Sequence, residues 1–270
     1  MSHAETLNPN AQALKAVFNR ITQPYAHEDL TRLAAVASVS RLKAMRNSDI
    51  DSPAIIIDAP PNEHLELTTD NSGIQRGLLM HRVLQRLDYQ RSSEDTLGEA
   101  LADLVRQGHL TSEELAQVDQ PALLWLFSTP LGTRMRQAAI QSSRSHQLLR
   151  ELNFLWSLPA RQAVGINPTA PPSLSLDTIM APGATKPHTT GLDIMLIRGT
   201  IDGLLIEPDF LEIIDYKTDA ASFIPSRLPA YQQQVRYYAA AAAEILKKPV
   251  HQTSLIFFST RQIISTSLSK

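Results

Sequence analysis

Apolar residues are concentrated in two neighbouring runs, residues 194–206 and 211–217, both rich in Ile and Leu. Apolar runs of this kind, bounded by turn residues, predict buried strands. Between them Glu207-Pro208-Asp209 has the composition of a turn, which sends the second run back along the first. The simplest interpretation is a β-hairpin.

Helical periodicity marks several other segments. Apolar residues recur every three or four positions over residues 73–89, which predicts a helix there. Residues 94–150 predict three more helices, of which the second opens with a capping box at residues 111–114. A further helix is predicted over residues 231–246, and short helices around a loop over residues 10–46.

Two more strands are predicted, at residues 151–158 and at residues 253–259. Residues 47–72 are mostly polar and irregular, which is typical of a linker that crosses a surface. Residues 165–190 hold five prolines and show no periodicity, so we expect a flexible loop between strands.

The predicted hairpin carries a carboxylate on each strand. Asp215 and Lys217 are two residues apart, so their side chains project from one face of the second strand. Taken alone, this pair fits a surface ion pair at a sheet edge better than a functional site. Asp202 interrupts the apolar first strand, so it is either buried at a cost or directed at a site. Two converging carboxylates need a cation or a proton between them, and their hard oxygens suit Mg²⁺ or Mn²⁺.

Three motifs, taken as a set, resemble those of a known nuclease family. They are Gly-Thr-Ile-Asp ending at Asp202, Ile-Ile-Asp-Tyr-Lys ending at Lys217, and the segment Tyr231–Tyr238. The chain resembles the RecB/AddA-type nuclease domain of the PD-(D/E)xK superfamily, and in particular the C-terminal nuclease domain of the AddA helicase-nuclease subunit. This resemblance implies an α/β fold with a restriction-endonuclease-like core, in which helices flank a central mixed β-sheet. Residues 1–72 would then be an N-terminal helical extension and linker, and residues 73–270 the nuclease domain.

The resemblance also implies which residues form the catalytic centre. Asp202, Asp215 and Lys217 would be catalytic. His81 would hold a metal ion together with the two aspartates and the backbone carbonyl of Tyr216. On a helix without this context, His81 is more often a packing or surface residue.

Four further residues acquire roles in the same way. Gln234 and Tyr238, four apart on one helix face, would bind DNA. Without the upstream motifs, a tyrosine in the core and a glutamine that caps a backbone group would be the better interpretation. Gly77 would leave room for nucleic acid or a neighbouring backbone beside the histidine. Glu151 would be an acid near the site, or a strand-end residue paired with Arg150 or a lysine.

Two groups of basic residues are candidate DNA-facing surfaces. One lies on the third of the helices predicted in residues 94–150 and consists of Arg134, Arg136, Arg144 and Arg150. The other, Arg41, Lys43 and Arg46, fits a phosphate contact or a solvated helix face.

Composition narrows the function. The formal net charge of −2 over 270 residues does not by itself indicate a nucleic-acid binder, so DNA contact would depend on local basic surface or on a partner.

The absence of cysteine excludes a disulfide framework, a thiolate zinc site and an Fe–S cluster in this chain. It contains no Gly-x-x-x-x-Gly-Lys-Ser/Thr loop, so no ATP site of that kind is expected. No apolar stretch approaches about 18 residues and no signal pattern opens the chain, so a cytoplasmic protein without membrane contact is expected.

These observations lead to one expected function and one alternative. We expect a Mg²⁺-dependent deoxyribonuclease, with Mn²⁺ as a second candidate ion and exonuclease favoured over endonuclease action. It would serve as the nuclease module of an AddAB/RecBCD-like double-strand-break repair enzyme, and its partners would be DNA, a helicase motor and an AddB-like subunit. The alternative is a catalytically silent, nuclease-like module that docks a DNA-repair partner.

Overall fold

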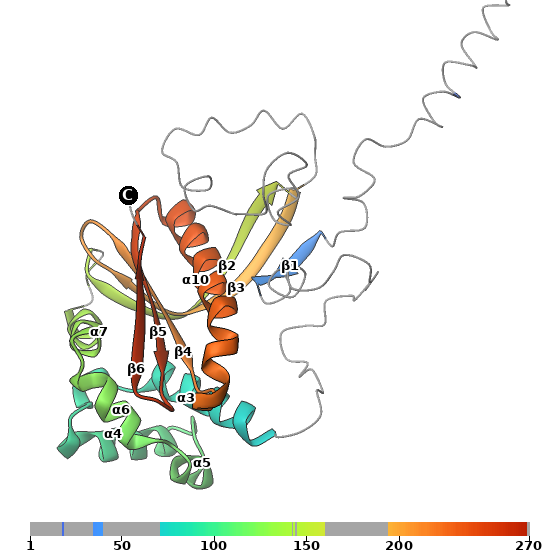
Figure 1. Cartoon of the computed structure of the whole chain (residues 1–270). Coiled ribbons are helices and arrows are strands. Elements are labelled where there is room, and N and C mark those ends of the chain that lie inside the picture. The colour runs from blue at the N-terminus through green and yellow to red at the C-terminus, as the bar shows by residue number, and fades with distance from the viewer. Residues whose placement is uncertain are drawn as a thin grey trace, which may run out of the picture.

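The computed structural model describes Phe18 and residues 35–39, 71–141, 143, 145–159 and 194–268 (Figure 1). The predicted linker up to residue 70, the flexible loop at residues 165–190 and the basic residues 41–46 lie outside this part of the chain. The same holds for Arg144.

A six-stranded mixed sheet forms the centre of the fold, in the order β1-β3-β4-β5-β6. The long strand β3 pairs with β1 near its start and with β4 near its end, and β2 pairs along its whole length. Its strands are β1 (Val36–Ser38), β2 (Gln147–Pro159), β3 (Ile194–Ile206), β4 (Leu211–Lys217), β5 (Val250–Phe257) and β6 (Gln262–Ser267). The pairs β1/β3 and β4/β5 are parallel and the others antiparallel. The predicted central mixed sheet is therefore confirmed.

The hairpin predicted from the two apolar runs is the pair β3/β4. Its strands pair from Ile206 opposite Leu211 to Gly203 opposite Ile214. The turn is closed by a hydrogen bond of 2.9 Å from the backbone N–H of Glu207 to the carbonyl of Phe210. Since β4 has a neighbour on each side, it lies in the interior of the sheet.

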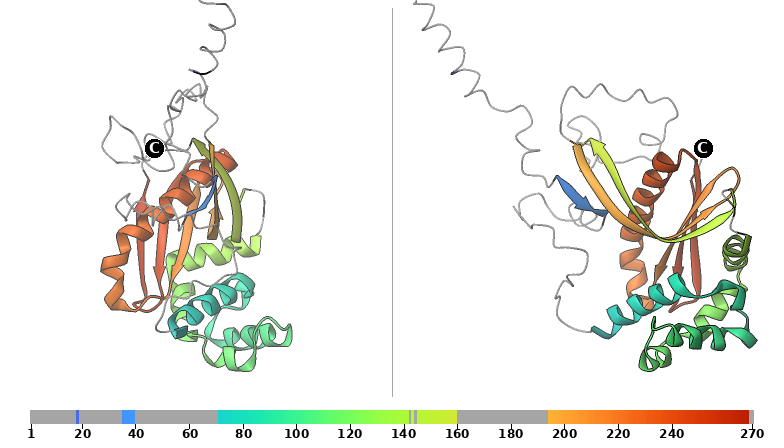
Figure 2. Two further views of the ribbon diagram at one scale, coloured as in Figure 1. Left: turned by 90° about the vertical axis from the view of Figure 1, so that its right-hand side faces the viewer. Right: turned by 180° about the vertical axis from the view of Figure 1, so that it is seen from behind.

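Helices cover both faces of the sheet (Figure 2). They are α3 (Asn71–Arg86), η2 (Tyr89–Arg91), α4 (Glu94–Arg106), α5 (Ser112–Ala116), α6 (Gln120–Ser128), α7 (Pro130–Gln141), η3 (Ala221–Phe223) and α10 (Ile224–Leu246). The long helix α10 lies along one face, while α3 to α7 gather on the other side, below the sheet in Figure 1. Among the described residues, none of the helices combines the length and apolar character needed to cross a membrane.

Two hydrophobic cores result, because successive side chains of a strand point to opposite faces. On β4, Leu211 and Ile213 pack into the core shared with α10. Ile214 and Tyr216 pack into the core shared with α3, α4, α6 and α7. A strand buried on both faces explains the continuous apolar run that predicted it.

Several predicted boundaries are wrong. Residues 36–38 form a strand rather than a helix, because they pair with the edge of β3. Residues 147–150 belong to β2 rather than to a helix. The segment predicted as the second of three helices is divided into α5 and α6. A new helix cap begins α6 at Asp119, whose carboxylate accepts a hydrogen bond from the N–H of Ala122. The helix expected to open at Tyr231 begins at Ile224.

Candidate active site

Helix α3 runs beneath the carboxyl ends of β4 and β5 in Figure 1. It places the His81 ring edge-on to that of Tyr216 on β4, at a centroid distance of 5.7 Å. The close approach is made at Gly77, where a Cβ would lie 3.0 Å from the Thr218 hydroxyl just beyond β4. A larger residue here would press on the Thr218 hydroxyl, so the glycine gives room to a neighbouring side chain. His81 lies one turn further along the helix.

Asp202 on β3 is turned toward this histidine. One of its oxygens accepts a hydrogen bond of 2.7 Å from the backbone N–H of Tyr216, and the other lies 3.5 Å from His81 Nδ1. The β3/β4 pairing ends at Gly203, opposite Ile214. The Asp202 carboxylate therefore accepts from a backbone N–H of β4 just beyond the last strand pair. With an exposed fraction of 8%, Asp202 is a buried acid whose orientation is set by the backbone.

Glu151 faces the same point from β2. The β2/β3 ladder pairs Arg150 with Gly203 and Leu152 with Ile201, and is interrupted only where Glu151 lies opposite Asp202. Glu151 has a φ of 50°, a left-handed conformation that costs a non-glycine residue about 1–3 kcal/mol and is typical of functional sites. Its carboxylate lies 3.4 Å from His81 Nδ1.

The neighbouring Arg150 ties β2 to the helix that carries the histidine. Its guanidinium donates to the carbonyls of Leu84, at 3.1 Å, and Leu87, at 2.8 Å, at the end of α3. The expected alternative, in which Glu151 pairs with Arg150, is therefore wrong. Glu151 instead joins His81 and Asp202, and one ligand atom of each lies within 4.8 Å of the others.

Asp215 and Lys217 project together from β4, with Lys217 Nζ 2.6 Å from Asp215 Oδ2. Their side chains are only 1% and 13% exposed, and β4 is an interior strand, so this is not a surface ion pair at a sheet edge. The ion pair engages this one oxygen, whereas an ionised carboxylate offers about four lone-pair sites for hydrogen bonds or a cation. The buried carboxylate thus retains coordinating capacity.

Gln234 and Tyr238 lie on α10 beside this pair. Gln234 accepts a hydrogen bond of 3.5 Å from Lys217 Nζ and donates one of 2.8 Å to the Tyr238 hydroxyl. The Tyr238 ring meets Phe154 edge-on at a centroid distance of 5.8 Å. Tyr238 is therefore a core residue whose hydroxyl is linked to the lysine through the glutamine.

The converging acids shift the protonation of the site. Burial, reinforced by the charge of Asp215, raises the pKa of the Asp202 carboxyl from 3.8 to about 7. Burial alone would lower the pKa of the His81 imidazole, but the Glu151 hydrogen bond and the charge of Asp202 raise it above 6.5. Each group thus holds its proton to a higher pH than it would in water.

The donor set fits a hard divalent ion. His81, Glu151 and Asp202 offer one imidazole nitrogen and two carboxylates, and Asp215 lies near enough for its charge to raise the pKa of Asp202. Oxygen-rich sets of this kind suit Mg²⁺ and Mn²⁺. The predicted metal group contained His81, Asp202 and Asp215. The described residues add Glu151 and leave Asp215 closest to Lys217.

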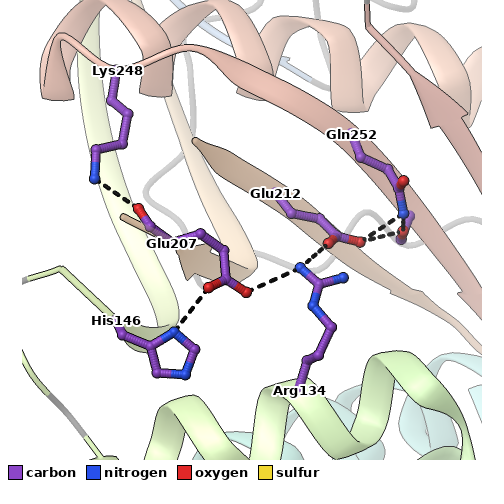
Figure 3. Close-up of polar contacts among 7 residues, drawn as sticks. Arg134, His146, Glu207, Glu212, Lys248 and Gln252 are labelled. Atoms are coloured by element: carbon purple, nitrogen blue, oxygen red, sulfur yellow. Dashed lines mark hydrogen bonds and ion pairs between the residues drawn. The ribbon is translucent and has the colours of Figure 1, made fainter. Parts of the chain in front are cut away.

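Of the four arginines predicted to face DNA from one helix, Arg134 and Arg150 make structural contacts instead. Arg134 on α7 lies between Glu207, at 3.2 Å, and the buried Glu212, at 2.9 Å (Figure 3). Arg150 lies on β2, where it caps α3. Each of these two arginines links a helix to the sheet. Their partners lie far away in the sequence, so helical periodicity could not predict them.

Sequence reasoning assigned no role to two other residues near the lysine. The Lys217 ammonium lies 4.5 Å from the centroid of the Tyr231 ring, and the Tyr231 hydroxyl donates to Asp219. Asp219 lies two residues after Lys217, and Tyr231 is the first residue of the Tyr231–Tyr238 motif. This nearness to the motifs was the one sequence signal that either residue lies near the site.

Comparison with known proteins agrees with this geometry. The chain is 29% identical over 252 residues to an ATP-dependent helicase/nuclease subunit from Moorella thermoacetica, and the match covers 89% of this chain and 16% of that protein. The subunits of the same name from Alkaliphilus oremlandii and Bacillus cytotoxicus are 28% and 26% identical, over 90% and 92% of this chain and 18% and 19% of theirs. The chain therefore spans less than a fifth of the length of these relatives.

The family itself is shown by a broader match. Residues 60–266 match the model of the PD-(D/E)XK nuclease superfamily, and this segment includes β2 to β5 and all but the last residue of β6. It also includes every residue of the site described above. The expected restriction-endonuclease-like fold is thus confirmed, and the chain belongs to the PD-(D/E)XK nuclease superfamily.

Proposed function

We propose that this chain is a Mg²⁺-dependent deoxyribonuclease module, with Mn²⁺ as an alternative ion. The observation that carries the proposal is the convergence of His81, Glu151 and Asp202 within 4.8 Å beside the buried Asp215–Lys217 pair. These groups come from four different elements, so their approach is a property of the fold rather than of local sequence. Three acids placed together repel one another and would destabilise the fold unless a cation or a proton lay between them.

His81, Asp202, Asp215 and Glu151 would hold the ion, with the Tyr216 carbonyl as a further ligand. When bound, the ion supplies an acidified water and a Lewis acid for phosphodiester hydrolysis. Lys217 offsets charge on the scissile phosphate and orients the attacking water. Gln234 holds the lysine from α10 and would bind the DNA backbone through its amide, and Tyr238 would support this DNA contact by fixing the amide.

We further propose that the module works beside a helicase motor and an AddB-like subunit in double-strand-break repair, where exonuclease action is favoured. The support is the activity named for the relatives, which are ATP-dependent helicase/nuclease subunits. A motor that feeds a strand into the site would make successive cleavage from an end the natural outcome.

Cleavage of labelled DNA tests the catalytic assignment. The 270-residue chain, incubated with Mg²⁺ and end-labelled linear DNA, should release shortened products, whereas Asp215→Ala and Lys217→Ala should each lower the rate by at least about a hundredfold. Asp209→Ala is the matched control, because Asp209 is an exposed acid in the turn of the same hairpin. Circular dichroism should show the same helix and strand content in all four proteins.

Two outcomes would contradict the proposal. If Asp215→Ala or Lys217→Ala cleaves at the wild-type rate, the assigned residues do not catalyse the reaction. If the wild-type chain neither cleaves nor binds Mg²⁺ or Mn²⁺ by calorimetric titration, the silent docking module becomes the better account.

A further inference from the structure

The lysine of the site is held by an aromatic ring that the proposed mechanism does not use. Lys217 Nζ lies 4.5 Å from the centroid of the Tyr231 ring, within the range of a cation–π contact. Asp215 and Gln234 approach the same nitrogen, at 2.6 and 3.5 Å. The ammonium is thus bounded by a carboxylate, an amide and a ring.

The ring is fixed in turn by Asp219. The Tyr231 hydroxyl lies 2.9 Å from both carboxylate oxygens of Asp219 and donates to them. Arg227 forms an ion pair with the same carboxylate, and the Ser259 hydroxyl donates to the Asp219 backbone carbonyl. Asp219 therefore connects the loop after β4, helix α10 and the end of β5.

Two physical effects follow from this arrangement. A free lysine side chain samples many rotamers, so fixed neighbours are needed to hold its ammonium at one point. In addition, a phenol that donates to a carboxylate becomes richer in electron density, which strengthens the attraction of its ring for a cation. Asp219 thus reinforces the contact as well as orienting the ring.

We propose that Tyr231 and Asp219 form a positioning pair that holds the Lys217 ammonium in place for catalysis. Tyr231 supplies the surface against which the ammonium rests, and Asp219 sets the orientation of that surface. Neither residue touches the reacting phosphate in this account, so neither is a catalytic residue. The inference rests on the proposed nuclease function for its kinetic consequence, whereas the contact itself does not depend on activity.

The contact has a spectroscopic signature that needs neither metal nor DNA. In the full chain with ¹³C-labelled lysine, the Hε protons of Lys217 should resonate upfield of those of the other lysines, because they lie over an aromatic ring. Lys217→Arg assigns the signal by removing it. The upfield shift should persist in Tyr231→Phe, weaken in Asp219→Asn and disappear in Tyr231→Leu.

The kinetic consequence is a loss of turnover rather than of DNA binding. Tyr231→Leu should lower kcat for Mg²⁺-dependent cleavage of the labelled DNA about tenfold with little change in KM. Tyr231→Trp, which keeps an aromatic surface, should recover part of this loss, and Asp219→Asn should fall between Tyr231→Leu and the wild type. Tyr237→Leu is the matched control, since it removes another buried tyrosine from α10 and should lower thermal stability without lowering kcat.

The outcomes separate the two proposals. A Lys217 resonance at an ordinary position, or a Tyr231→Leu protein with wild-type kcat, would overturn the positioning role. A kcat loss in Tyr237→Leu equal to that in Tyr231→Leu would overturn it as well, because general destabilisation would then explain both. An inactive wild-type chain would contradict the nuclease proposal instead, and the lysine resonance would still decide the contact.

Discussion

Asp202 and His81 each bind a proton more tightly in the folded chain than in the unfolded one. Burial beside Asp215 raises the pKa of Asp202 to about 7, and the surrounding acids raise that of His81 above 6.5. A group whose pKa is raised by folding stabilises the fold at low pH and loses that contribution as the pH rises through its folded pKa. For Asp202 this loss runs from pH 3.8, its ordinary pKa, up to about pH 7, and for His81 it lies above pH 6.5.

We predict that the metal-free chain becomes less stable as the pH rises from about 4 to about 7. In urea unfolding, Asp202→Asn should reduce this dependence and should be more stable than the wild type at the upper end of that range, because the amide carries no charge into the buried site. Saturating Mn²⁺ should reverse the trend in the wild type, since the ion requires the deprotonated acid and neutral imidazole. An Asp202→Asn protein with the wild-type pH dependence would contradict this account.

The conformation and position of Glu151 could not be predicted from its residue type. Its acidic character was visible in the sequence, but its left-handed backbone and its place opposite Asp202 depend on the β2/β3 pairing. The partner of Arg150, the end of α3, is likewise remote in sequence. Interactions of this kind are set by tertiary packing, which local patterns do not encode.

At the scale of elements, the placement of α3 decides whether the site can form. The helix touches the end of β4 through Gly77 and Thr218, and it carries His81 one turn later. Since α3 is fixed at its other end by Arg150, a displacement at Gly77 would tilt the helix and move the imidazole. The short glycine-to-threonine contact therefore controls the distance between His81 and the acids.

We predict that Gly77→Val lowers the cleavage rate by at least about tenfold, since small displacements of catalytic groups are costly. The added branches would press against Thr218, where even a Cβ lies 3.0 Å from the hydroxyl. Gly98→Val is the matched control, because a Cβ at this helical glycine of α4 meets nothing within 4 Å. Adding Thr218→Ala to Gly77→Val should restore part of the rate, and a failure of Gly77→Val to slow cleavage would refute the role of this contact.

Elements were predictable where burial and turn chemistry agreed. The hairpin β3/β4 and the opening cap of α5 match the sequence signals closely, because each is specified by neighbouring residues. The strand β1 was missed because three residues show no periodicity and its pairing partner lies far along the chain. The start of α10 was missed because Pro225 and Pro229 suggested a loop, whereas the helix accommodates both in its first two turns.

At the scale of the whole molecule, the two cores hold the site between them. One core packs α10, with Gln234 and Tyr238, against the sheet, and the other packs α3, with His81. β4 belongs to both, and its end carries Asp215 and Lys217. The class of fold could be predicted because the motifs resemble a family, whereas the meeting of the two layers at one point required the structure.

Anomalous diffraction at the manganese edge, from crystals of the full chain grown with Mn²⁺, tests this meeting point most directly. We predict a peak bounded by the His81 imidazole and the carboxylates of Asp202 and Asp215, with Glu151 at its side. The same peak should be absent in Asp202→Ala and present in Asp209→Ala. A wild-type peak elsewhere, or none at Mn²⁺ concentrations that support DNA cleavage, would contradict the proposed metal site.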